Sequence, residues 1–183
     1  MGLRRVPKEE MPEAHAERVE RAYELNGDAD FLEILANSPA LVSFYYEDFY
    51  DGVFYNGDVP IRVKELVRLR LAGLHGCMYC QNSDVESAKE HGVTDEEIEA
   101  IWRMDDDIFT DAERAALELA NVLSNASPDG EVSKDLFDRL QRYYSDTEIV
   151  ELSVVASILT GMTNMLFAFD MVEKDVVCEL PGT

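Results

Sequence analysis

The sequence predicts an all-α fold on three observations. Apolar residues recur at the helical period, most clearly at Val63, Leu66, Val67, Leu71 and Leu74. Threonine precedes glutamate by three residues at two predicted helix starts, which is the pattern of a capping box. The alternation of apolar and polar residues that is typical of strands is missing, and 6 prolines and 10 glycines in 183 residues leave long uninterrupted runs.

The expected helices follow from these signals and from the residues that start and stop them. Asn-Gly-Asp at 26–28 and at 56–58 should end helices, as should Gly76 and Gly92. Asp58 is expected to cap the following helix, with Pro60 in its first turn. Residues 105–107 should form a solvated loop and residues 125–130 a turn. Helices are expected at residues 12–25, 29–37, 40–55, 62–74, 77–91, 94–103, 110–123, 133–143 and 146–173.

The length suits one helical domain over residues 1–183. Within it we expect an N-terminal helical extension (1–57), a core with the cysteine motif (58–104) and C-terminal helices (105–183). The aromatic segment 44–55 should either line a pocket over the cysteines or contribute to an interface between copies. The apolar stretch 152–169 should pack within the protomer or between protomers.

Composition excludes several classes of partner. Acidic residues number 38 against 16 basic ones, a net charge of −22. Nucleic acid and anionic membrane surfaces require clustered Lys and Arg, so we expect neither as a partner.

Residues 1–12 lack the apolar run of a secretory signal. The uncharged stretch 152–169 contains several polar residues and has acidic flanks, so we expect a helix buried on nearly all sides and not a membrane span. The expected compartment is the cytoplasm.

Cys77 and Cys80 form a Cys-x-x-Cys motif at the expected start of a helix. Unpaired backbone N–H groups and the helix dipole stabilise a thiolate there, and the second thiol lies one turn away, close enough to form a disulfide. We expect Cys77 to be the more exposed, attacking thiol, an order that can reverse in such pairs. The alternatives are half of a zinc site, which lacks a second ligand pair, or two buried structural cysteines. Cys178 has no partner at a useful spacing.

Glu65 lies twelve residues before Cys77, on the preceding helix. A hairpin at residues 75–76 would bring its carboxylate back toward the thiols. A partly buried carboxylate there would have a raised pKa and could exchange a proton with a thiol. The alternative is a solvated glutamate or one paired with a neighbouring arginine (Arg62, Arg68 or Arg70).

These residues together resemble a known family. The chain is similar to the alkylhydroperoxidase D-like branch of the carboxymuconolactone decarboxylase family in one extended pattern. The pattern consists of Glu65, eleven intervening residues, Cys-x-Tyr-Cys at 77–80, and a helix with Ala88 and Gly92 before Thr-Asp-Glu-Glu-Ile. The similarity covers about residues 62–102. It implies an orthogonal bundle of about eight helices, assembly into homotrimers or homohexamers, and a cysteine pair that reduces peroxides or cycles with a disulfide carrier.

The chain departs from the family pattern at the proton relay. The family's peroxidases carry a histidine four residues after the second cysteine, where this chain has Asp84. Some carry another just before that cysteine, where this chain has Tyr79. Helical spacing places Asp84 on one face with the cysteines, so it can act as a base, although its charge would also raise the thiol pKa. His75 and Tyr79 are the other candidate relay groups. His91 is expected only to interact favourably with the helix dipole at the C-terminus of its helix.

The predicted function is that of a thiol-dependent, peroxiredoxin-like antioxidant oxidoreductase. Its catalytic residues would be Cys77, Cys80 and Glu65, its substrate a small organic hydroperoxide or disulfide, and no metal, haem or flavin is implied. Electrons would come from a dithiol donor such as a lipoylated or thioredoxin-like protein. The Asp84 departure motivates a second hypothesis, a non-catalytic thiol sensor or oligomeric binding protein. A third is a cofactor-independent lyase or isomerase in which Glu65 works alone.

Overall fold

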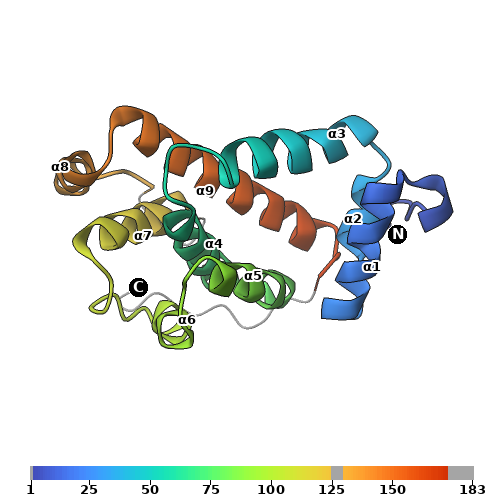
Figure 1. Cartoon of the computed structure of the whole chain (residues 1–183), viewed down its shortest axis with the longest axis horizontal. Coiled ribbons are helices and arrows are strands. Elements are labelled where there is room, and N and C mark those ends of the chain that lie inside the picture. Colours follow the sequence, from blue (N-terminus) through green and yellow to red (C-terminus); the bar gives the residue numbers. More distant parts are fainter. Residues whose placement is uncertain (1, 125–129, 173–183) are drawn as a thin grey trace.

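The computed structural model describes residues 2–124 and 130–172. Within these ranges it contains helices and no strand, which confirms the all-α prediction (Figure 1). The elements are η1 (Lys8–Glu10), α1 (Glu13–Asn26), α2 (Asp30–Leu35), α3 (Pro39–Ser43), η2 (Phe44–Phe54), α4 (Ile61–His75), α5 (Met78–Glu90), α6 (Asp95–Trp102), α7 (Asp111–Leu123), α8 (Lys134–Tyr143) and α9 (Asp146–Ala168).

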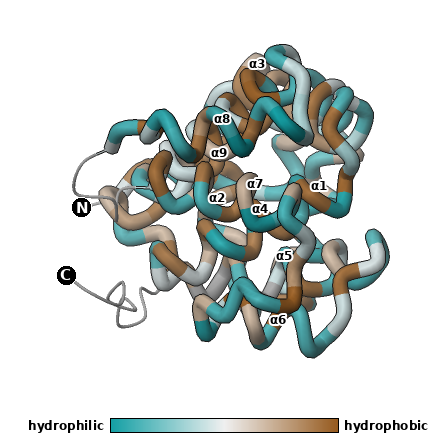
Figure 2. Tube along the Cα trace, turned by 90° about the vertical axis from the view of Figure 1, so that its left-hand side faces the viewer, coloured by the Kyte–Doolittle hydropathy of each residue, from teal (hydrophilic) through white to brown (hydrophobic). Residues whose placement is uncertain are grey.

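Helix α4 is the central element of the fold. It packs against α5, α6, α7 and α9. Val63, Val67 and Leu71 on one side join a large apolar cluster that includes residues of α1, α2, η2, α7, α8 and α9, whereas Leu66 and Leu69 join a second cluster with α5, α6 and α7. The tube in Figure 2 alternates between apolar and hydrophilic residues along the helices, as expected when each helix turns one face to the core.

The buried charges of α4 are paired, as burial requires. Lys64 is fully buried, and its ammonium donates hydrogen bonds to the carbonyl of Val53 (2.8 Å) and to Glu151 of α9 (2.8 Å). Arg70 forms an ion pair with Asp106. In the expected solvated loop at residues 105–107, Asp105 and Asp107 are exposed, whereas Asp106 is partly buried because it balances a buried guanidinium.

The helix boundaries follow most of the predicted start and stop signals. Gly76 (φ 64°) and Gly92 (φ 85°) adopt the left-handed conformation just after α4 and α5. The two threonine capping boxes, before α6 and α7, are formed as predicted. The prediction that Asp58 caps α4 is wrong: Pro60 is the capping residue, and the Asp58 N–H instead donates to Glu151 (2.7 Å). The expected turn at 125–130 lies largely outside the described residues.

The aromatic segment differs from the single helix expected over residues 40–55. A short α3 is followed by a π-helix, η2, in which the N–H of Tyr55 donates to the carbonyl of Tyr50, five residues earlier (2.8 Å). Lengthening each turn by one residue rotates the aromatic side chains relative to an α-helix. Tyr45, Phe49 and Phe54 are thereby buried in the core.

Helix α9 ends at Ala168, five residues before the predicted end at Glu173, which lies outside the described residues. It is long and apolar enough to cross a membrane by length and composition. One face of α9 is buried in the main apolar cluster. The opposite face, which includes Val154, Ser157 and Gly161, is exposed, so the expectation of burial on nearly all sides is wrong.

A candidate dithiol–disulfide site beside a tyrosine-lined pocket

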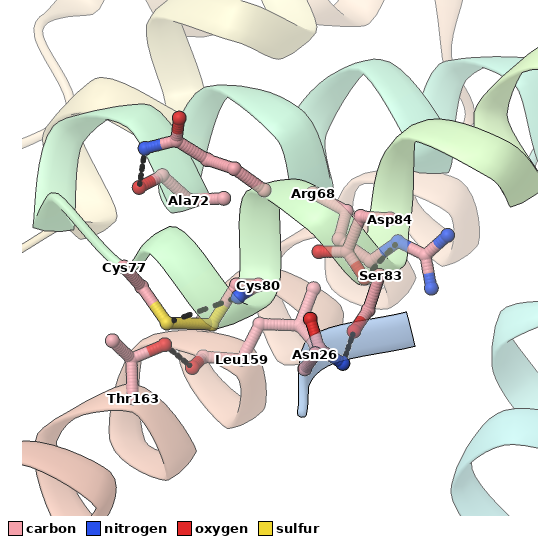
Figure 3. The surroundings of a disulfide bond; sticks show 10 residues. Asn26, Arg68, Ala72, Cys77, Cys80, Ser83, Asp84, Leu159 and Thr163 are labelled. Carbon is pink, nitrogen blue, oxygen red and sulfur yellow. Dashed lines mark hydrogen bonds and ion pairs between the residues drawn. A yellow bond between two sulfur atoms is a disulfide. The ribbon is translucent and has the colours of Figure 1, made fainter. Parts of the chain in front are cut away.

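The two cysteines of the motif lie at the start of α5 and are joined by a disulfide, with their Cα atoms 5.3 Å apart (Figure 3). Cys77 is the capping residue of α5, and its sulfur accepts a hydrogen bond from the N–H of Cys80 (3.3 Å). The first-turn N–H groups of a helix lack intrahelical partners, so this position favours a thiolate when the pair is reduced. Gly76 permits the sharp turn from α4 that places Cys77 there.

The two sulfurs differ in access. Cys77 is 0% exposed, whereas Cys80 is only partly buried and lines a pocket of about 470 Å³. The expectation that Cys77 is the more exposed thiol is therefore wrong. The physical reason is that Cys77 sits in the turn between α4 and α5 and packs into the core cluster, while Cys80 is one turn further along α5. A molecule in the pocket meets Cys80 first.

The pocket lies between α1, α2, η2, α4, α5 and α9, and its wall is largely aromatic. The sequence left open whether the aromatic segment lines a pocket or an interface, and here it lines the pocket. The aromatic lining residues are Phe31, Tyr45, Tyr46, Tyr50 and Tyr55. Burial raises the pKa of the Tyr50 phenol, so it stays protonated. On the α9 side, Leu159 and Thr163 lie next to the disulfide, and the Thr163 hydroxyl donates to the Leu159 carbonyl (3.0 Å, Figure 3).

Two buried carboxylates share one arginine next to the pocket. Glu65 is 0% exposed and forms an ion pair with Arg68, one turn further along α4. The Nε atom of Arg68 lies 3.5 Å from an Asp84 carboxylate oxygen, and the Asp84 side chain is 14% exposed (Figure 3). The pKa of Asp84 is raised to about 6. Burial is the largest cause, the Arg68 guanidinium opposes it, and the Glu65 carboxylate raises the pKa further. Glu65 is thus buried and arginine-paired, and its ion pairs and hydrogen bonds join it to Arg68, Ser87 and His91 and not to Cys77 or Cys80.

The second oxygen of Glu65 faces the far end of α5. It accepts a hydrogen bond from the Ser87 hydroxyl (2.8 Å) and lies 3.3 Å from Nδ1 of His91. Nδ1 also lies 2.8 Å from the Ser87 carbonyl, and the imidazole stacks on Tyr55 with ring centroids 5.9 Å apart. The Ser87 hydroxyl is bound to the glutamate and not to the imidazole, so the three residues do not form a nucleophilic serine triad.

Sequence reasoning missed part of this arrangement. The sequence indicates Arg68 only as a possible ion-pair partner of Glu65 and His91 only as a helix-end residue, and it gives Ser87 no role. A signal was present in the spacing. Cys80, Asp84, Ser87 and His91 follow one another at four, three and four residues, which places them on one stripe of α5 facing α4.

The remaining candidate residues lie away from this stripe or outside the description. His75 is buried at the end of α4 and is not among the pocket-lining residues. The side chain of Tyr79 and the whole of Cys178 lie outside the described part of the structure. Among residues 2–124 and 130–172, no group of three or more His, Cys, Asp or Glu side chains is arranged to hold a metal ion.

Comparisons with known proteins agree with this fold. An uncharacterized peroxidase-related protein from Ralstonia eutropha JMP134, described as an alkylhydroperoxidase AhpD core, superposes with a TM-score of 0.71 at 16% identity, covering 95% of this chain and 93% of the other. A variant of the debrominase Bmp8 in complex with 2,3,4-tribromopyrrole gives a TM-score of 0.66 at 21% identity, covering 91% and 90% of the two chains. The chain therefore has the alkylhydroperoxidase D-like all-α fold.

The family model confirms the resemblance drawn from the motif. Residues 42–121, which include Glu65, both cysteines of the motif and Asp84, match the model of the carboxymuconolactone decarboxylase family. A related sequence, the uncharacterized protein YdfG of Bacillus subtilis (strain 168), is 24% identical over 106 residues, or 57% of this chain and 71% of the other.

Proposed function

We propose that this protein is a thiol-dependent peroxidase or disulfide oxidoreductase in which Cys77 and Cys80 cycle between dithiol and disulfide. The observation that carries the proposal is the position of Cys80, which borders the pocket and is bonded to Cys77 behind it. A substrate in the pocket therefore meets one sulfur, while the second is within bonding reach to complete the cycle. The family and the fold support a peroxidase-related role in general terms.

The cycle balances with a hydroperoxide and a dithiol. The Cys80 thiolate attacks the terminal oxygen of the hydroperoxide, the O–O bond breaks, and Cys80 becomes a sulfenic acid while an alkoxide leaves. The alkoxide takes up the proton that the Cys80 thiol lost. The Cys77 thiol then attacks the sulfenic sulfur, the S–S bond forms, and water leaves. A dithiol donor, either a lipoylated or a thioredoxin-like protein, reduces the disulfide and is itself oxidised.

Asp84 and Glu65 are proposed to hold the proton between these steps. Asp84 follows Cys80 by one helical turn and has a pKa raised to about 6, which suits a group that takes a proton from a thiol and returns it to an alkoxide. Glu65 acts through Arg68 and the Ser87 hydroxyl, which borders the pocket. His91 holds the glutamate from the other side. The proposed assembly is a homotrimer or homohexamer.

Rapid mixing of the reduced protein with cumene hydroperoxide tests this function. A Cys178→Ser background restricts the signal to the pair. We expect Cys80→Ser to abolish the rapid reaction, and Cys77→Ser to react once and leave a sulfenic acid that dimedone traps. Glu65→Gln should lower the rate by about 10²-fold, the typical contribution of acid–base catalysis.

The result that would refute a peroxidase is clear. If the Cys178→Ser protein, with both Cys77 and Cys80 intact, oxidises no faster than free cysteine at the same pH, the pair is not activated toward peroxides. Lipoamide disulfide in place of the hydroperoxide then tests the disulfide oxidoreductase part of the proposal separately.

A second candidate function, reductive dehalogenation, is favoured by the tyrosine-rich wall of the pocket. The debrominase Bmp8, whose structure holds 2,3,4-tribromopyrrole, has the same fold. In that reaction the dithiol would become a disulfide while the ring carbon exchanges bromine for hydrogen and hydrogen bromide leaves. Bromide release from tribromopyrrole by the reduced protein, matched by loss of two thiols, would establish it. The absence of release would rule out the dehalogenase and leave the peroxidase and the disulfide oxidoreductase as candidates.

A further inference from the structure

Arg18 stands apart from the other cations of the molecule. Among the described residues, every lysine and arginine except Arg18 and Arg142 forms an ion pair with a carboxylate. With 38 acidic residues in the chain, a carboxylate is easy to find. Arg142 is exposed on α8, whereas Arg18 borders the pocket that contains Cys80.

The guanidinium of Arg18 is held in place without a carboxylate. It lies over the ring of Tyr46, 4.3 Å from the ring centroid, and one of its nitrogens donates to the carbonyl of Ala14 (3.1 Å). A guanidinium has five N–H groups, so donors remain for a further acceptor. The contact with the tyrosine face fixes the plane of the group and reduces the entropy that a ligand would otherwise have to remove.

The other charges of the pocket are already neutralised or solvated. Arg68 is paired with Glu65 and Asp84, and Arg21 with Glu86 (2.9 Å). Two further lining acids, Asp51 and Glu90, are exposed to solvent. Water and salt screen such exposed charges, whereas a carboxylate in direct contact with a guanidinium forms two charge-assisted hydrogen bonds. Contact with Arg18 should therefore decide the charge preference of the pocket.

We propose that the pocket binds an amphipathic organic anion, with an aromatic or unsaturated body against the tyrosines and a carboxylate on Arg18. The wall on which the body would lie includes Phe31, Tyr45 and Tyr50, and Cys80 lies on α5, in the same pocket as Arg18 on α1. The orientation that brings a hydroperoxide group to Cys80 rests on the proposed function. Binding of the anion itself does not.

Equilibrium binding to the oxidised protein tests the site independently of turnover, because the disulfide form does not react with the probes. Three probes share one body and differ in charge: 4-isopropylbenzoate, 4-isopropylbenzamide and 4-isopropylbenzylammonium. By titration calorimetry we expect the carboxylate to bind about tenfold more tightly than the neutral amide, since hydrogen bonds between a guanidinium and a carboxylate are stronger than those to a neutral amide. The ammonium should bind more weakly than the amide.

Variants assign this preference to one residue. Arg18→Gln should bind the carboxylate and the amide equally, Arg18→Lys should retain part of the difference, and Arg142→Gln, the control that removes the other unpaired arginine, should match wild type. Thermal melting checks that each variant is folded. Equal binding of the two probes by wild type, tighter binding of the ammonium, or an equal effect of Arg142→Gln would overturn the proposal.

A matched pair of substrates links the site to the reaction. Cumene hydroperoxide and its para-carboxylated analogue differ only in the carboxylate, and we expect the analogue to have a lower KM in wild type and no advantage in Arg18→Gln. If neither compound is reduced but the binding difference holds, the proposed function fails while the anion site stands. If both are reduced equally and the binding difference is absent, the anion site fails while the peroxidase stands.

Discussion

Asp84 provides the sharpest test at the scale of single residues. Its pKa of about 6, raised by burial and held down by Arg68, means that it is mostly ionised at about pH 7 and mostly protonated at about pH 5. Because only the ionised form can accept the thiol proton, we expect the rate of oxidation of the reduced protein by cumene hydroperoxide to fall as pH drops through about 6. Asp84→Asn should react more slowly and lack this inflection, measured by stopped-flow mixing from about pH 5 to about pH 9. An unchanged profile in the variant would remove Asp84 from the reaction.

The same carboxyl group also affects folding stability. Its pKa in the folded protein exceeds its ordinary value of 3.8, so the folded state binds this proton more tightly than the unfolded state. The stability that this group contributes is therefore present at low pH and is lost as pH rises from about 4 through about 6. Urea unfolding at about pH 4.5 and about pH 7 should show that wild type loses more stability than Asp84→Asn over this interval. Parallel changes in the two proteins would contradict the assignment.

The residues of the site could be predicted only as far as local spacing reaches. Cys80 and Asp84 lie within α5 and Cys77 caps it, so helical geometry places the three together without knowledge of the fold. The contact of His91 with Glu65 depends on the register between α4 and α5, which the sequence does not specify. For the same reason the relative exposure of the two cysteines was predicted wrongly: it depends on which elements cover the turn between the helices.

At the scale of elements, the joint between η2 and α4 depends on Gly57. A Cβ atom there would lie 2.5 Å from the Val53 carbonyl oxygen and even closer to the carboxylate of Glu151. Glu151 holds Lys64 and the N–H groups of Asp58 and Val59, so displacing it would leave a buried ammonium without its partner. We expect Gly57→Ala to lower the free energy of unfolding by about 3 kcal/mol, in the range for a broken buried pair.

Gly161 is the matched control for this substitution. It lies within α9, and a Cβ atom at this position meets nothing within 4 Å. Gly161→Ala should raise stability by about 1 kcal/mol because alanine has the higher helix propensity. Chemical denaturation of both variants measures the contrast, and a neutral Gly57→Ala would show that the joint tolerates a side chain.

The aromatic segment marks a limit of prediction at this scale. The residues between Pro39 and Tyr55 have helical character by composition and by their flanking stop signals, and the segment is helical. An α-helix and a π-helix differ in whether each N–H bonds to the fourth or the fifth preceding carbonyl, and the rings of this segment pack on Phe31 of α2 and Arg68 of α4. That packing brings Tyr45, Tyr46, Tyr50 and Tyr55 to the pocket, so the pocket wall could not be read from local sequence.

At the scale of the whole molecule, the fold class was predictable because its signals are local. The capping boxes before α6 and α7, the glycines after α4 and α5, and the apolar period of α4 each act within one element. The pocket is different, because six elements contribute to it and its walls come from residues as distant as Arg18 and Leu166. The pocket therefore exists only when α1, α2, η2, α4 and α9 have packed around α5.

The net charge of −22 has a consequence for the proposed electron donor. An acidic donor protein would be repelled at long range, and salt weakens this repulsion because the Debye length falls from about 30 Å at 0.01 M to about 8 Å at 0.15 M ionic strength. We expect the disulfide to be reduced faster by an acidic lipoylated domain as ionic strength rises over this range. Reduction by dihydrolipoamide, which is uncharged, should not change and serves as the control.

A basic thioredoxin-like donor should show the opposite dependence, because salt screens attraction as effectively as repulsion. The three salt profiles, measured by following thiol formation in the pair under single-turnover conditions, therefore distinguish long-range steering from chemistry at the disulfide. If the acidic donor and dihydrolipoamide respond identically to salt, the surface charge does not govern the encounter. Donor choice must then be decided by contact with the mouth of the pocket, where Arg18, Arg21 and Glu86 would be the first residues to exchange.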